Sequence, residues 1–138
     1  MKSTVIIPCL QYKEARKAID WLCEAFGFEE HLVVPGDNGT IAHAQLNLGG
    51  AMLMLSSAKS GTELSGYFVQ PSEVEGRVTQ APYVILKDED LDTHFQKAKS
   101  AGAKIIIALR EEEYGGRNYS CTDIEGHVWS FGSYDPWE

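Results

Sequence analysis

The sequence contains the same order of predicted elements twice, and this repeat limits the fold more than any other feature. In each copy, apolar residues at three- and four-residue spacing predict one amphipathic helix between runs of β-branched residues. The helices end at Gly27 and Gly102, which lie 75 residues apart. The hairpin glycines Gly50 and Gly126 lie 76 residues apart, so the offset is nearly constant. We therefore predict two tandem copies of one βαβββ unit.

This repeat predicts an α+β fold and sets the domain boundaries. We expect a single domain over residues 1–138, with a first module over 3–57, a linker over 58–80 and a second module over 81–136. The linker lacks periodicity, and we expect one short extended piece in it at Tyr67–Val69. Two paired modules would form a curved mixed sheet with helices outside and a concave cup inside, where a small molecule would bind.

The composition excludes several classes of function. The chain has 138 residues, 43% of them hydrophobic, which is enough for its own core. Its formal net charge is −8, so we expect neither nucleic acid nor an anionic membrane as a partner. No apolar run approaches the roughly 20 residues of a membrane span, and no signal peptide is evident, so we expect a cytoplasmic protein. Three cysteines without C-x-x-C spacing predict neither a disulfide framework nor a zinc site.

Two segments, 18–28 (AIDWLCEAFGF) and 123–132 (DIEGHVWSFG), resemble the vicinal oxygen chelate superfamily. This group contains glyoxalase I, extradiol dioxygenases, fosfomycin-resistance enzymes and bleomycin-resistance proteins, and the resemblance extends from Val5 to Pro136. It implies a divalent metal held by side chains from the first and last strands of each module. The matching positions are Ile7, Met54, Ala81 and Ser130. Such side chains do not supply the nitrogen and oxygen ligands that a hard or borderline ion requires, so we expect no metal, no cofactor and no catalytic residues.

The strands should still present a ligand-binding surface to the cup. Alternation along 41–48 places His43 and Gln45 on one face, which is either the cup or a solvated outer surface. The loop at Tyr114 either closes over a ligand or is merely flexible. The residues expected to bind a ligand are Cys9, Gln11, His43, Gln45, Met52, Met54, Tyr83, Tyr114, Ser120 and Ser130. This lining is apolar to mildly polar and includes two adaptable methionines, which suits flat aromatic compounds.

The resemblance and the missing ligands favour a non-enzymatic protein that binds or sequesters a planar or amphipathic drug-like molecule, as bleomycin-resistance proteins do. We expect antibiotic resistance as its role, and a homodimer whose strands or modules are either swapped or kept within each subunit. The acidic clusters would attract a cationic guest if they ring the cup; otherwise they are a solvated surface. One alternative is a metal-dependent glyoxalase-, lyase- or thiol-transferase-like enzyme with atypical ligands such as His43 and Cys9. Another is an interaction module that uses Tyr67, Phe68 and Trp137.

Overall fold

The first module forms a four-stranded sheet with one helix against it. A computed structural model describes residues 4–138. In chain order the elements are β1 (Cys9–Tyr12), α1 (Ala15–Phe26), β2 (Glu29–Pro35), β3 (Ile41–Leu48) and β4 (Ala51–Ser57). The strand order is β1-β4-β3-β2, with β1 parallel to β4 and the other neighbours antiparallel. Helix α1 ends where Gly27 takes a left-handed conformation, with φ of 85°, which glycine adopts without strain.

The second module repeats this arrangement. Its elements are β5 (Tyr83–Ile85), α2 (Asp88–Ser100), β6 (Lys104–Glu111), β7 (Arg117–Thr122) and β8 (Val128–Gly132). The order β5-β8-β7-β6, with β5 parallel to β8, matches that of the first sheet. The predicted α+β fold with two tandem βαβββ modules is therefore confirmed. The strands of the two modules form two separate hydrogen-bonded sheets.

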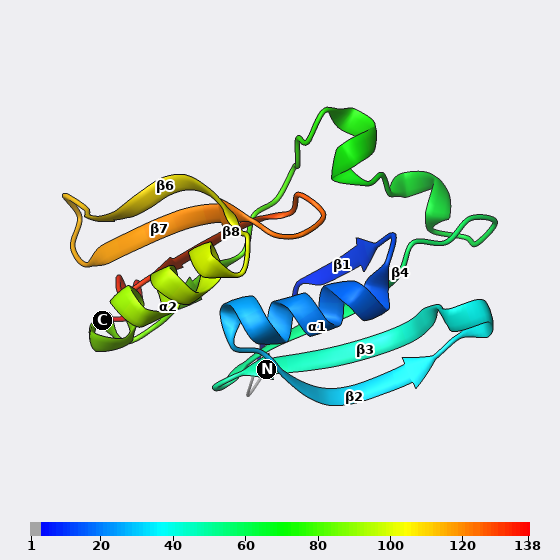
Figure 1. The fold of residues 1–138 in the computed structure, drawn as a ribbon, viewed down its shortest axis with the longest axis horizontal. Helices are drawn as coiled ribbons and strands as arrows, with labels where there is room; N and C mark the ends of the chain where they lie inside the picture. The colour runs from blue at the N-terminus through cyan, green and yellow to red at the C-terminus, as the bar shows by residue number, and fades with distance from the viewer. Residues whose placement is uncertain (1–3) are drawn as a thin grey trace.

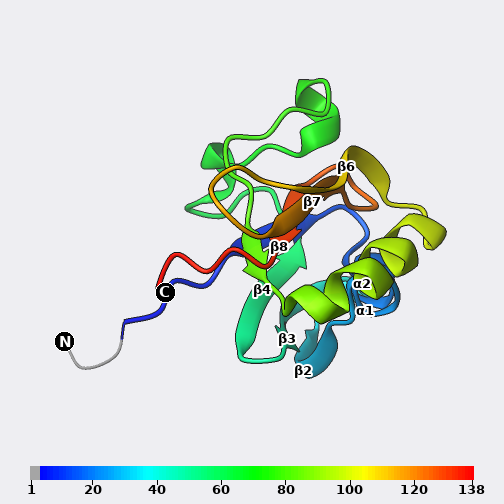
Figure 2. The same ribbon diagram turned by 90° about the vertical axis from the view of Figure 1, so that its left-hand side faces the viewer.

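The two helices pack side by side and join the modules into one core (Figure 1). Phe26 of α1 contacts the rings of Trp129 and Phe131 on β8, and both of these are buried, as their alternation with Ser130 predicts. Figure 2 shows both helices on one side of the molecule, while the N- and C-terminal segments extend from the opposite side.

His94 of α2 also links the modules, a role that the sequence did not reveal. Its Nε2 lies 2.8 Å from the Phe26 carbonyl oxygen, and its Nδ1 lies 2.6 Å from the Tyr119 hydroxyl. Because a carbonyl only accepts, Nε2 carries the proton, and Nδ1 accepts from the Tyr119 hydroxyl. Burial lowers the pKa of His94 below its ordinary value, which favours this neutral form.

A second link joins the β7–β8 hairpin to the first module. The buried Asp123 carboxylate accepts hydrogen bonds from the Tyr12 hydroxyl at 2.6 Å and from Trp129 Nε1 at 3.0 Å. The Glu125 carboxylate accepts the backbone N–H groups of Lys13 and Glu14, at 2.6 and 2.9 Å. Free N–H groups before a helix need acceptors, so the second module supplies the cap of α1.

The expected extended piece in the linker is present only in part. Tyr67 belongs to a short 3₁₀ turn over Ser65–Tyr67, whereas Phe68 is extended, with φ of −110° and ψ of 147°, and a second turn follows over Pro71–Val74. Strand β6 continues to Glu111, because Arg110 and Glu111 pair with Asn118 and Arg117 of β7. Within residues 4–138, no helix is long and apolar enough to cross a membrane.

Candidate functional site

Six of the predicted ligand-binding residues share the outward face of the first sheet. Their neighbours along each strand, such as Leu10 and Leu53, pack toward the helix, so strict alternation turns these six away from it. The six are Cys9 and Gln11 on β1, His43 and Gln45 on β3, and Met52 and Met54 on β4. Met54 is the cross-strand partner of Cys9 on one side and of Gln45 on the other. The His43 and Gln45 side chains lie 3.1 Å apart, between His43 Nε2 and Gln45 Nε2.

The other four predicted residues gather on the second sheet. Tyr83 is the cross-strand partner of Ser130, and the Ser120 and Ser130 hydroxyls are 2.7 Å apart. Tyr114 lies in the β6–β7 turn, where its hydroxyl accepts a 2.9 Å hydrogen bond from Asn118 Nδ2. Within residues 4–138, no hydrogen bond or ring contact joins this set to the set on the first sheet. The structure therefore divides the predicted residues between two separate places, one on each module.

The metal positions implied by the family resemblance carry unsuitable side chains. The Met54 and Ser130 backbones donate to the Pro8 and Pro82 carbonyls, each at 3.0 Å, so Ile7 and Ala81 precede the start of the strand pairing. The residues paired with Met54 and Ser130 are Cys9 and Tyr83. A thioether, a hydroxyl, a phenol and one thiol do not fit a hard divalent ion. In the part of the chain that the structure describes, no three His, Cys, Asp or Glu side chains converge as metal ligands.

A cavity of about 620 Å³ lies between β1 and the linker over 58–80. Of the ten residues predicted to bind a ligand, Cys9 and Gln11 line this cavity and the other eight do not. His127 closes one side, where its Nε2 lies 2.9 Å from the Gln11 carbonyl oxygen. The lining residues are Cys9, Leu10, Gln11, Tyr67, Phe68, Val69, Gln70, Pro71, Val74, Arg77, Val78, Thr79, Gln80 and His127.

Sequence reasoning missed the linker's share of this cavity. The linker was expected to connect the modules or, through Tyr67 and Phe68, to serve an interaction module, yet it supplies most of the cavity wall. The available signal was the apolar run Tyr67–Val69 inside an otherwise polar segment. Both Tyr67 and Phe68 are exposed in the chain, and exposed aromatic side chains beside a cavity are typical of binding surfaces.

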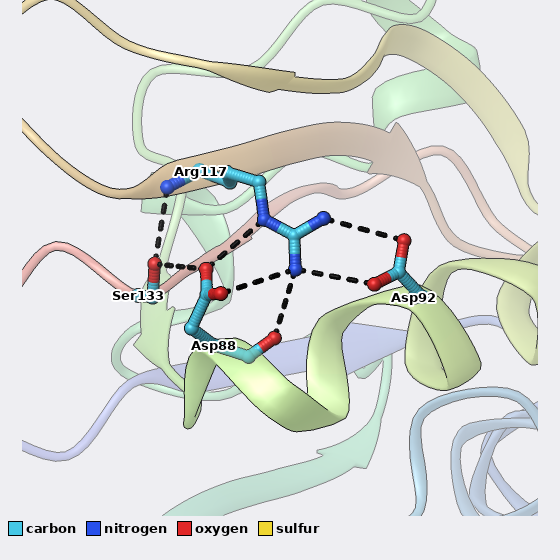
Figure 3. Close-up of polar contacts among 4 residues, drawn as sticks. All are labelled: Asp88, Asp92, Arg117 and Ser133. Carbon is cyan, nitrogen blue, oxygen red and sulfur yellow. Dashed lines mark hydrogen bonds and ion pairs between the residues drawn. The ribbon is translucent and has the colours of Figure 1, made fainter.

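The acidic cluster at the start of α2 lies away from this cavity. Arg117 of β7 donates to both carboxylate oxygens of Asp88, at 3.0 and 3.3 Å, and to those of Asp92 (Figure 3). Ser133 completes the group by donating to Asp88 Oδ1 at 3.1 Å. These hydrogen bonds lower the pKa of Asp88 and raise that of Arg117. A second cavity of about 340 Å³ adjoins this cluster together with Glu111 and Glu112. No acidic residue lines the larger cavity.

Comparison with known proteins identifies a family. The family model described as "Glyoxalase/Bleomycin resistance protein/Dioxygenase superfamily" matches residues 5–131. Uncharacterized proteins of Mycobacterium bovis and Mycobacterium tuberculosis are each 34% identical over 126 residues, or 91% of this chain. The match covers 80% of the M. bovis protein and 71% of the M. tuberculosis protein.

Solved structures share the fold. The crystal structure of TioX from Micromonospora sp. ML1 is 32% identical with a TM-score of 0.72, and the match covers 94% of each chain. The fosfomycin resistance protein FosX from Listeria monocytogenes, with Mn(II) and 1S,2S-dihydroxypropylphosphonic acid, has a TM-score of 0.69 at 17% identity. That match covers 99% of this chain and 94% of FosX, and at such identity it shows the fold alone.

Proposed function

The chain belongs to the Glyoxalase/Bleomycin resistance protein/Dioxygenase superfamily, and from this premise we propose that it binds and sequesters a planar or amphipathic small molecule without transforming it. The observation that carries the proposal is the cavity of about 620 Å³ between β1 and the linker. Its size is typical of ligand sites, and its walls are mainly apolar and aromatic with a few polar groups.

The chemistry of the lining favours binding over catalysis. A general acid–base mechanism needs a titratable group free to exchange a proton with substrate. The cavity offers Cys9 and His127, and the His127 ring already contacts the Gln11 carbonyl. Sequestration of a toxic compound would then give resistance by mass action, since each bound molecule is withdrawn from its target.

The alternative is a metal-dependent enzyme of the glyoxalase, lyase or thiol-transferase type with atypical ligands. His43 lies on β3 and Cys9 on β1, with β4 between them. A metal at either would need further ligands, and the cross-strand partners Met54 and Gln45 are poor ones. Elemental analysis of the purified protein separates the two proposals, because about one Zn, Ni or Mn per chain would favour the enzyme.

A homodimer forms part of the same proposal. Apolar side chains near both chain ends extend into solvent, with Ile6 exposed by 91% and Trp137 by 90%. Tyr83 and Ile85 add apolar surface on the outward side of β5. A second copy seated on this side would cover these residues and complete a cup from faces that lie apart in one chain, whether or not strands are swapped. We also place the protein in the cytoplasm, a reducing compartment that suits its three free thiols.

The proposal is tested by calorimetric titration with bleomycin, a quinoxaline peptide and ethidium at low salt. The variant Phe68→Ala removes part of the cavity wall and should weaken binding roughly three- to tenfold, as expected for a partly buried aromatic contact. The control Leu64→Ala removes an exposed apolar side chain of the same linker outside the cavity and should leave binding unchanged. Absence of binding by all three compounds, or an equal effect of both variants, would contradict the proposal.

A further inference from the structure

Gln70 lines the cavity under the linker and carries an unsatisfied acceptor. The residue is only 5% exposed, and its buried Oε1 has no hydrogen-bond partner within residues 4–138. The nearby Glu73 backbone N–H donates instead to the Gln70 backbone carbonyl, at 2.9 Å. A buried carbonyl oxygen without a donor is unfavourable, so a ligand that supplies an N–H or O–H group would gain from this position.

Arg77 supplies an unpaired positive charge at the same cavity. Its guanidinium makes no ion pair and no side-chain hydrogen bond in the described part of the chain, whereas Arg16, Arg110 and Arg117 each contact a carboxylate. The cavity has no acidic lining residue to oppose it. In a chain with net charge −8, the one Lys or Arg side chain that lines this cavity is therefore a cation without a partner among the described residues.

Much of the remaining cavity wall is apolar. Phe68, Val69, Val74 and Val78 of the linker all line the space. Such a wall suits a flat ring system, and a guanidinium binds a carboxylate through paired N–H donors. The polar groups thus define which substituents the ring should carry.

We propose that this cavity binds an aromatic carboxylic acid that also carries a hydroxyl or amide N–H group. The carboxylate lies at Arg77, the N–H or O–H group donates to Gln70 Oε1, and the ring packs along Phe68. This inference rests on the proposed binding function and names the ligand class of one part of the site. It differs from the cationic guest that the overall charge suggests.

The test compares four naphthalene probes by isothermal titration calorimetry. 6-Hydroxy-2-naphthoate carries both groups, 2-naphthoate lacks the hydroxyl, 2-naphthol lacks the carboxylate, and 2-naphthylmethylamine is a cation. We expect 6-hydroxy-2-naphthoate to bind most tightly and the amine to bind most weakly. Equal or tighter binding of 2-naphthol or the amine would overturn the inference.

Matched variants locate the two contacts. Arg77→Gln should weaken both carboxylates roughly three- to tenfold, as for a solvent-exposed charge pair, and leave 2-naphthol unchanged. Lys59→Gln removes the same charge from the linker outside the cavity and should change nothing. Gln70→Leu should abolish the advantage of 6-hydroxy-2-naphthoate over 2-naphthoate, with circular dichroism and thermal melting verifying the fold. Equal effects of Arg77→Gln and Lys59→Gln would overturn the carboxylate assignment.

Two further outcomes separate this inference from the proposed function. If bleomycin, the quinoxaline peptide or ethidium binds while no naphthalene carboxylate does, the ligand class is wrong and the binding function stands. If none of the compounds binds, both fail. The affinity of the protein for the naphthalene carboxylates should not depend on protein concentration. If this affinity falls as the protein dimerises, a second copy fills the cavity, and the inference is overturned.

Discussion

At the scale of single residues, His94 makes stability depend on pH. Burial holds its pKa below the ordinary value of 6.5, so the unfolded chain binds a proton at higher pH than the folded protein does. As pH falls through 6.5, His94 should lower the free energy of unfolding by at most about 1.4 kcal/mol per pH unit, until the folded imidazole is itself protonated.

This pH dependence can be measured by urea unfolding between about pH 5 and 7.5, since His titrates in that range. The variant His94→Gln should lose this part of the slope. His31→Gln, on the exposed strand β2, should retain it. An unchanged slope in the His94 variant would refute the assignment of this pH dependence to His94.

The three cysteines should differ in reactivity by their burial. Cys9 is exposed, whereas burial raises the pKa of Cys121 to about 12 and raises that of Cys23 to a lesser extent. Labelling with a thiol reagent near neutral pH should modify Cys9 first, and Cys121 only after unfolding. Bound ligand should slow labelling of Cys9, which lines the cavity. Rapid labelling of all three, counted by mass spectrometry, would contradict this order.

At the scale of elements, the second module should stabilise the start of α1. Replacement Glu125→Ala removes the acceptors for the Lys13 and Glu14 backbone N–H groups. We expect a loss of about 1 kcal/mol in the free energy of unfolding, the usual effect of a helix cap. Glu63→Ala removes the same charge from the exposed linker and serves as the control. Equal stability of the two variants in urea unfolding would show that the cap contributes nothing.

The elements also show what the sequence could and could not predict. The helices and most strands were predictable because local periodicity reports which face is buried, as for Trp129 and Phe131. The same alternation predicted Cys9 and Met54 on one face, and the structure makes them cross-strand partners. The far end of β6 was not predictable, because Arg110 and Glu111 carry no strand signal and pair only through β7. The cavity depends on how the linker folds back over β1, which no local pattern encodes.

At the scale of the whole molecule, the exposed apolar surface near the chain ends should support a dimer. Sedimentation equilibrium should detect dimers of the wild-type chain. The variant Ile6→Lys places a charge in that surface and should weaken association, because burying an unpaired charge is unfavourable. Lys59→Gln, on the linker, should associate as the wild type does. A monomeric wild-type chain would contradict the dimer.

The central claim, binding without reaction, is tested most directly by recovering the ligand. Of bleomycin, the quinoxaline peptide and ethidium, the compound that binds most tightly is added until the protein is saturated. The complex is then incubated overnight with and without added Mn²⁺ or Zn²⁺. The complex is finally denatured, and the molecular mass of the released compound is measured by mass spectrometry. We predict that the compound is recovered with unchanged mass and that binding saturates in every sample. A product of altered mass that forms in repeated turnovers would contradict the claim.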